Sequence, residues 1–351
     1  MVTMENQLLD TLVNDQKNVT DIYKPGPYWQ KKALSAIREI KKNGLNNLRS
    51  STDINSAASA YGDNTVTDAR TILETTSLKN RLGLAILNHT SLKKLFDFQV
   101  ATTKNLLKTV LELEKNKLVL SNPERLSELI ENYKIENSIN FGCDRISTFR
   151  NKDYSTYYLQ ILDLLDLVER KRSLKKLQSF LEVGPGFGAN IHLIEQNFSN
   201  FKKFIVIDIV PNVWVVTEYL RKIYGESVND YLVTKNMKEI KFKDDTSLEI
   251  FVIPPWEIEK ISSSSIDCFW NSSSFVEMSP EIVKNYAEKF LEIGTKESVY
   301  NFITYDRFDP KTTFPPDQIQ ELFSKVEFEK LVHPILENSE RESYFYIGKS
   351  K

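Results

Sequence analysis

A glycine-rich turn between an apolar run and a helical pattern constrains this chain of 351 residues more than any other feature. The apolar run at residues 180–183 leads into Gly184, Gly186 and Gly188, and apolar residues then recur at helical spacing over residues 191–198. Glycines lack a Cβ atom, so the backbone there can turn sharply and approach a ligand closely. The first N–H groups of the helix remain available to a polar ligand group. The sequence therefore predicts a buried strand, a ligand-binding turn and a helix.

An acidic residue at the end of the predicted strand helps to decide between two classes of ligand that such a turn can bind. Gly184, Gly186 and Ala189 fit the G-x-G-x-x-G/A dinucleotide pattern, which is a weak signal alone. Glu182, however, would place like charge beside a pyrophosphate, whereas it suits a cationic ligand that carries an amine. S-adenosylmethionine carries an amine and a sulfonium, and E/D-x-G-x-G-x-G is the motif of the most widespread fold that binds it. We favour this cofactor; a dinucleotide and a merely connecting turn remain alternatives.

A second acid supports the same cofactor. Asp208 ends the next apolar run, at residues 204–207, where a carboxylate can accept hydrogen bonds from both ribose hydroxyls. Ligands of open α/β sheets bind outside the carboxyl ends of the strands, so other residues at those ends are candidates too. The predicted cofactor-binding residues are Glu182, Gly184, Gly186, Gly188, Asp208, Ile209 and Asn271.

From residue 177 onward, strand and helix patterns alternate, which is typical of a parallel sheet with crossover helices. The fold class is therefore α/β, with a Rossmann-like seven-stranded sheet of the methyltransferase type. The last two strands form the hairpin that closes it. The predicted strands lie near residues 180–183, 204–207, 248–253, 266–270, 299–304, 326–331 and 343–347.

The N-terminal half has a helical pattern over residues 1–130, with a long helical region at 68–120 and an irregular stretch at 131–152. We expect residues 1–152 to form a helical cap that shapes the substrate pocket or a homo-oligomer interface. Residues 153–351 would form the cofactor-binding domain.

Composition excludes several classes of protein. Hydrophobic residues make up 41% of the chain, enough for a sizeable core, and the net charge of −2 offers no basis for binding nucleic acid. The two cysteines form no metal-ligand spacing, which predicts no metal site of that type and a reducing compartment. Neither a secretory signal nor a run of apolar residues long enough to span a membrane is visible. We therefore expect a cytoplasmic protein without a transmembrane segment.

Three motifs resemble the bacterial sugar O-methyltransferase family of the S-adenosylmethionine-dependent superfamily. They lie at residues 182–188, 206–211 and 271–278, and the last is similar to the family's Asn-Thr-x-Ser-Phe-x-Glu-Met signature, with Ser272 replacing Thr. Residues 23–29 are weakly similar to a Lys-Pro-Ser-x-x-Trp motif, with Gly26 in place of Ser. The resemblance implies O-methylation of a sugar hydroxyl on a glycan, sugar nucleotide or secondary metabolite. A non-sugar small molecule methylated on oxygen or nitrogen, or a non-catalytic scaffold subunit, remains an alternative.

A hydroxyl acceptor also needs a proton acceptor within hydrogen-bond reach. The candidates at the predicted rim are Glu277, then Asp306, then His333. Glu277 lies in the signature block, but it could equally cap the helix that begins near Ser279. Some sugar methyltransferases hold a divalent metal with Asp and Glu, so Mg²⁺ on Asp306 and Glu277 is a further alternative, although no ligand spacing demonstrates it.

Overall fold

The computed structural model describes residues 4–43, 49, 122–143, 146–305, 314–332 and 343–351. Contacts divide the chain into two compact units: the residues up to Lys31 together with Leu164–Lys351, and Lys32–Asp163. The first thirty or so residues thus group with the C-terminal part rather than with the rest of the N-terminal half. The predicted functional division after residue 152 is a separate matter and stays a prediction.

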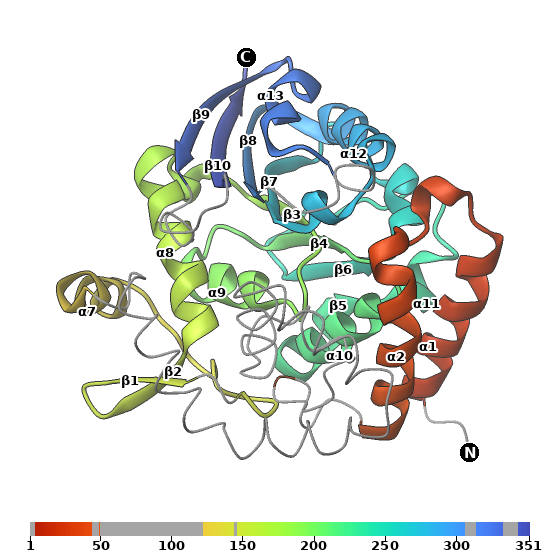
Figure 1. Cartoon of the computed structure of the whole chain (residues 1–351), viewed down its shortest axis with the longest axis horizontal. Helices are drawn as coiled ribbons and strands as arrows, with labels where there is room; N and C mark the ends of the chain where they lie inside the picture. The colour runs from red at the N-terminus through yellow and green to blue at the C-terminus, as the bar shows by residue number, and fades with distance from the viewer. Residues whose placement is uncertain (1–3, 44–48, 50–121, 144–145, 306–313, 333–342) are drawn as a thin grey trace, which may run out of the picture. The chain divides into compact units, whose positions relative to one another are not determined.

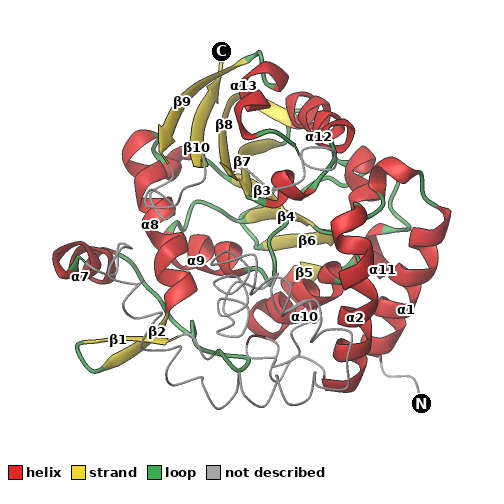
Figure 2. Cartoon of the chain, in the orientation of Figure 1, coloured by secondary structure: helices red, strands yellow, loops and turns green. Residues whose placement is uncertain are grey.

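The larger unit is built on one mixed, mostly parallel sheet with the strand order β5-β6-β4-β3-β7-β8-β10-β9. Strand β10 runs antiparallel to both β8 and β9, and the other neighbours are parallel. All seven predicted strands are present, and the last two form the closing hairpin (Figure 2). This confirms the predicted α/β fold with a seven-stranded core, to which the short β5 adds an edge. The strands are β3 (Ser179–Val183), β4 (Lys203–Ile207), β5 (Val228–Asn229), β6 (Glu249–Ile253), β7 (Ile266–Ser272), β8 (Gly294–Tyr305), β9 (Val326–Val332) and β10 (Ser343–Ser350).

The central strands are buried along their whole length. Every residue of β3, β4 and β6 is buried, which explains why these segments read as continuous apolar runs rather than alternating ones. The chain builds outward from β3 to β4 on one side and later from β7 to β8 on the other, so the strand order reverses between β3 and β7. Ligands of such sheets bind at this reversal, outside the carboxyl ends of the strands.

Helices cover both faces of this sheet. Figure 1 shows α9 and α10 on one side and α12 and α13 on the other. This two-sided cover is what a parallel sheet requires, since crossover connections place helices on its faces. Helices of this unit include α9 (Ala189–Asn197), α10 (Asn212–Tyr224), α11 (Tyr231–Thr234), α12 (Pro280–Ile293) and α13 (Ile319–Leu322), and α8 (Thr156–Lys171) crosses the boundary between the two units. The 3₁₀ turns of the larger unit include η2 (Asp21–Tyr23), η8 (Pro255–Lys260) and η9 (Ser274–Glu277).

An aromatic stack fixes α12 against the sheet. The ring of Phe269 on β7 stacks between Phe290 of α12, at 4.5 Å between ring centroids, and Tyr300 of β8, at 4.8 Å. All three side chains are buried. Burying such a ring contributes roughly 1.5–3 kcal/mol, and truncating Phe269 to alanine would cost about 3–5 kcal/mol because a cavity remains.

The N-terminal segment of the larger unit contains α1 (Met4–Asp15), η2 and the first turn of α2 (Pro27–Asn43). Leu8, Leu9 and Leu12 of α1 are buried, and α1 contacts α10 and α11. The helical pattern predicted for the N-terminal half is therefore confirmed at α1 and α2. The predicted helical region at 68–120 lies outside the described residues.

The smaller unit contains helix α7 (Pro123–Asn132), and the hairpin of β1 (Ile146–Phe149) and β2 (Lys152–Ser155). Asn122 caps α7, since its side chain accepts hydrogen bonds from two backbone N–H groups of the first turn. The prediction that residues 131–152 are irregular is wrong for β1. Its two-residue turn, Arg150-Asn151, has φ values of 49° and 63°, the left-handed conformation that primed hairpin turns require. Across the part of the chain that the structure describes, no helix is long and apolar enough to cross a membrane.

Candidate active site

The glycine turn lies where the strand order reverses, directly after β3. Gly184, Gly186 and Gly188 have φ values of 74°, 63° and 101°, a region that other L-residues rarely adopt. A Cβ atom on Gly184 would lie 2.4 Å from the Cβ and Oγ atoms of Ser274, in the segment after β7. The turn therefore needs glycine both for its conformation and for the close approach of the β7 segment. Gly188 is the N-terminal cap residue of α9, so the predicted strand, turn and helix are all confirmed.

Glu182 is buried in β3, with 2% of its surface exposed. Its Oε1 accepts a 3.3 Å hydrogen bond from Nδ2 of Asn190, in the first turn of α9. Its Oε2 is buried and has no hydrogen-bond partner among the described residues. Burial raises the pKa of this carboxyl to about 8, and the neighbouring Asp208 adds to the rise. Glu182 is thus a carboxyl group that would hold its charge far better with a cation or donor beside it.

Asp208, at the end of β4, is in a similar state. Its Oδ1 accepts hydrogen bonds from the N–H of Ile209 at 2.7 Å and from Nδ2 of Asn212 at 3.3 Å. Within the described part of the chain, its buried Oδ2 accepts no hydrogen bond of good geometry, and the backbone N–H of Gly186 is close enough to lower the pKa of the group. Burial raises the pKa of Asp208 to about 7, and the charge of Glu277 contributes. The backbone of Ile209 therefore orients this carboxylate, while the predicted contact of Ile209 with the cofactor stays a prediction.

Three buried acceptor oxygens converge on the carboxyl edge of β3 and β4: Glu182 Oε2, Asp208 Oδ2 and Asn190 Oδ1. None of the three has a hydrogen-bond partner in the residues that the structure describes. Buried polar atoms are almost always paired in folded proteins, so such a group points to a ligand that brings donors. Two carboxylates in the group also disfavour an anionic ligand.

Asn271 joins β7 to β3 at the reversal point. Its Nδ2 donates to the carbonyl oxygen of Val183 at 2.9 Å and also bonds Ser274 Oγ, and its Oδ1 accepts from the N–H of Phe275 at 3.1 Å. The side chain is fully buried. These bonds give Asn271 a structural role, since they hold the segment after β7 against the end of β3, where the glycine turn begins. The predicted direct contact with the cofactor stays a prediction.

Glu277 ends the 3₁₀ turn η9, which follows β7. Its Oε2 accepts a 2.5 Å hydrogen bond from the indole Nε1 of Trp29, which belongs to the N-terminal segment of the same unit. The effect of Glu277 on the pKa of Asp208 places its charge near that carboxyl. Of the three predicted proton acceptors, this is the one that the structure describes: Asp306 and His333 lie outside the described residues.

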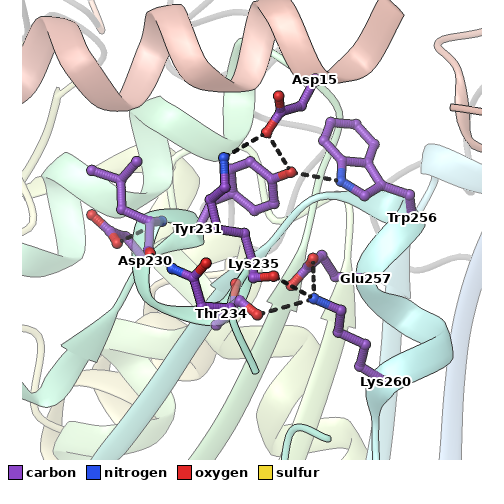
Figure 3. A network of polar contacts seen from close by, with 10 residues as sticks. Asp15, Asp230, Tyr231, Thr234, Lys235, Trp256, Glu257 and Lys260 are labelled. Atoms are coloured by element: carbon purple, nitrogen blue, oxygen red, sulfur yellow. Dashed lines mark hydrogen bonds and ion pairs between the residues drawn. The ribbon is translucent and has the colours of Figure 1, made fainter. Parts of the chain in front are cut away.

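A network of polar contacts connects the loop after β6 to α11 and to α1 (Figure 3). The indole Nε1 of Trp256 donates to the hydroxyl of Tyr231 at 3.2 Å, and this hydroxyl donates to Asp15 of α1 at 2.9 Å. Lys235 Nζ donates to the same oxygen of Asp15 at 3.0 Å. The N-terminal segment is therefore tied to the sheet by polar bonds as well as by its buried leucines.

Sequence reasoning missed Asn190, Ser274 and the role of Trp29. Asn190 could have been found from its place in the first turn of the helix, where a short polar side chain reaches back to the strand. Trp29 carried one signal, its place in the weakly matching motif of the N-terminal segment. Among the residues that the structure describes, no three His, Cys, Asp or Glu side chains are grouped as metal ligands. The Mg²⁺ alternative depended on Asp306 and receives no support.

No family model matches the chain, and no curated protein matches it. Solved structures that resemble it include phosphoethanolamine N-methyltransferase 2 of Haemonchus contortus in complex with S-adenosyl-L-methionine, at 12% identity and a TM-score of 0.38, over 54% of this chain and 52% of that one. The chain thus spans about half the length of the Haemonchus protein. A SAM dependent methyltransferase from Aquifex aeolicus has 12% identity and a TM-score of 0.37, over 66% of this chain and 99% of that one. The Burkholderia thailandensis 1,6-didemethyltoxoflavin-N1-methyltransferase has 11% identity and a TM-score of 0.36, over 55% and 78%. The assignment of the fold rests on the strand order and the glycine turn described above.

Proposed function

We propose that this chain is an S-adenosylmethionine-dependent methyltransferase that methylates a hydroxyl group of a small molecule, in the first place a sugar. One observation supports the assignment of the cofactor: Glu182 and Asp208 have unpaired buried oxygens beside a glycine turn, at the point where the strand order reverses. Their raised pKa values reflect a site that favours a ligand with positive charge and hydrogen-bond donors. An amine, a sulfonium and two ribose hydroxyls meet that description.

The rival ligand, a dinucleotide, fits these residues less well. Its pyrophosphate would lie at the glycine turn, next to the carboxyl of Glu182, which is buried and close enough to Asp208 to feel its charge. A pyrophosphate would oppose ionisation of this carboxyl still further, whereas a cationic ligand would stabilise its charged form. The same two carboxylates stabilise a cationic ligand, so the charge of the site favours the sulfonium cofactor.

When bound, the cofactor would supply a methyl group activated by the positive sulfur. The chain's own residues then have three tasks. Asp208 would accept the ribose hydroxyls, and Glu182, held by Asn190, would lie beside the cationic end. Glu277, fixed by Trp29, would accept the proton of the acceptor hydroxyl as the oxygen attacks. Holding the two reactants together supplies much of the acceleration.

The acceptor class rests on the resemblance of residues 271–278 to the sugar O-methyltransferase signature. A carboxylate at Glu277 supports a hydroxyl acceptor, since a hydroxyl must lose its proton during transfer. The scaffold alternative would be expected to have lost the cofactor site. Here the acids, the glycines and the conformation of the turn are all present, which supports an enzyme.

Calorimetry tests the cofactor. S-adenosylmethionine and S-adenosylhomocysteine should bind with a dissociation constant on the order of micromolar, about −8 kcal/mol, and NADH should not bind. Binding of NADH alone would refute the assignment. Asp208→Asn should weaken the binding of S-adenosylhomocysteine, because the amide nitrogen replaces one acceptor oxygen.

A transfer assay tests the activity. Cofactor with a radiolabelled methyl group is incubated with sugar nucleotides, lipid-linked glycans and small hydroxylated metabolites. Label should appear on one class and should depend on Glu277, with Glu277→Gln lowering turnover by roughly 10²–10⁴ while cofactor affinity is retained. No transfer to any class, with normal cofactor binding, would favour the scaffold.

A further inference from the structure

The N-terminal segment crosses the carboxyl edge of the sheet and is attached to the loop after each of three strands. Asp15 bonds Tyr231 of α11, which follows β5. Tyr23 donates to Glu259 of η8, after β6. Trp29 donates to Glu277 of η9, after β7. These are the ends of the strands where ligands of such sheets bind, and the three attachments belong to one compact unit.

The last attachment is closely packed. A Cβ atom on Gly26 would lie 3.4 Å from the carbonyl oxygen of Glu277, so the segment's backbone runs against η9. The carbonyl oxygen of Gly26 accepts hydrogen bonds from the N–H groups of Trp29 and Gln30, at 2.9 Å and 3.0 Å. The first turn of α2 therefore sets the direction of the Trp29 indole, and the indole reaches the Glu277 carboxylate at 2.5 Å.

An indole is well suited to this role. It has one N–H donor and only two side-chain torsions, so it fixes its acceptor with little loss of conformational entropy. A hydrogen bond to a charged group is shorter and stronger than one between neutral groups, and it stabilises the ionised carboxylate. A carboxylate held this way is aimed in one direction.

We propose that Trp29 is a positioning residue, which holds the Glu277 carboxylate against the place where the transferred methyl group lies, so that the N-terminal segment completes the methyl-transfer site. This inference rests on the proposed function, since it assumes that the cofactor occupies the glycine turn. The charge of Glu277 raises the pKa of Asp208, which supports a location at the cofactor rather than on a remote surface. Trp29 acts through Glu277 and need not touch the substrate itself.

The test uses two cofactor analogues and needs no acceptor. S-adenosylhomocysteine has a neutral sulfur, whereas sinefungin carries a protonated amine where the transferred methyl group would be. The ratio of their affinities, measured by calorimetry, reports the negative charge at that place. The wild-type protein, Glu277→Gln, Trp29→Phe and the double variant form a cycle, and Tyr23→Phe is the matched control from the same segment.

We expect the wild-type protein to prefer sinefungin, and Glu277→Gln to reduce this preference about tenfold. Trp29→Phe should reduce it roughly threefold or more, and should have no further effect once Glu277 is glutamine. Tyr23→Phe should leave the preference unchanged. In all variants, the affinity for S-adenosylhomocysteine should stay close to that of the wild type.

Three results would overturn the inference: Glu277→Gln keeps the full preference, Trp29→Phe keeps it, or Trp29→Phe lowers it equally in both backgrounds. The last result would mean a general structural role. If Trp29→Phe does not fold, Glu277→Asp decides, because it retains the charge but draws the carboxylate back from the indole. An unchanged preference in Glu277→Asp refutes the positioning role. Failure of both analogues to bind the wild-type protein would instead refute the proposed cofactor.

Discussion

Replacing Glu182 by glutamine should stabilise the ligand-free protein at alkaline pH while weakening its hold on the cofactor. Glutamine keeps the shape of the side chain and an oxygen for the bond from Asn190, but it removes the buried ionisable group. The carboxyl of Glu182 is buried, so the protein pays a free-energy penalty whenever this group ionises without a cation beside it.

The size of the effect follows from the pKa. Burial raises the pKa of Glu182 from 4.5 to about 8, so between these values the native state binds a proton that the unfolded chain has lost. The wild-type protein is therefore not penalised for Glu182 below the unfolded pKa, where the carboxyl is protonated in both states. It loses stability as pH rises from there toward the folded pKa. At roughly 1.4 kcal/mol per pH unit, Glu182→Gln should gain about 3–4 kcal/mol over the wild type between about pH 5 and about pH 8.

Thermal unfolding followed by tryptophan fluorescence measures this difference. All four tryptophans belong to the larger unit, so their signal reports the unit that holds the site. The variant's midpoint should exceed that of the wild type by roughly 6–12 °C more at about pH 8 than at about pH 5. Glu297→Gln, at an exposed carboxylate of the same unit, should show no such pH-dependent gain. A difference between Glu182→Gln and the wild type that does not change with pH would refute the reasoning.

Three further changes test other parts of the structure. Gly184→Ala should abolish binding of S-adenosylhomocysteine in calorimetry, because the new Cβ would meet a side chain at 2.4 Å. Gly225→Ala, also at positive φ but with nothing within 4 Å of its new Cβ, should bind normally and lose roughly 1–3 kcal/mol of stability through backbone strain alone. Lys203→Met should destabilise the protein by about 3–5 kcal/mol in urea unfolding, because it removes the 2.9 Å ion pair of the buried Glu249. Adding Glu249→Leu should recover most of this loss, and a double variant without recovery would contradict the pairing. Tyr231→Phe should lower stability by roughly 1–3 kcal/mol and speed proteolysis between α1 and α2, since its hydroxyl links α1 to the loop after β6. An unchanged cleavage rate would argue against that link.

The sheet and the two buried acids at its carboxyl edge could be predicted because their signals are local. A buried parallel strand is a short apolar run, and each run of this kind in the C-terminal half became a strand. The glycine turn and Glu182 lie within a few residues of each other, so their proximity can be recognised from sequence alone. Asp208 is recognisable for the same reason, as the first polar residue after the second strand.

The contacts that complete the site could not be predicted, because they join distant parts of the chain. Trp29 and Glu277 are separated by 248 positions, and no periodicity or spacing relates residues so far apart. The structural use of Asn271 was hidden as well, since a polar residue at a strand end can serve a ligand or the neighbouring strand equally well. The turn at Arg150-Asn151 lacks the glycine that usually marks a primed hairpin turn, so β1 and β2 gave no local signal.

Glu182 and Asp208 destabilise the ligand-free protein, and for that reason they are the strongest argument that it is an enzyme rather than a scaffold. Two buried carboxyls with unpaired oxygens are costly, and a protein that used this fold only to bind a partner would gain stability by replacing them. A cationic ligand removes the cost by supplying the missing charge and donors. Loss of the positive charge, when the sulfonium becomes a neutral sulfur, would restore part of that cost. The same two acids would then favour binding of the methyl donor and release of its product, which is the order that repeated turnover requires.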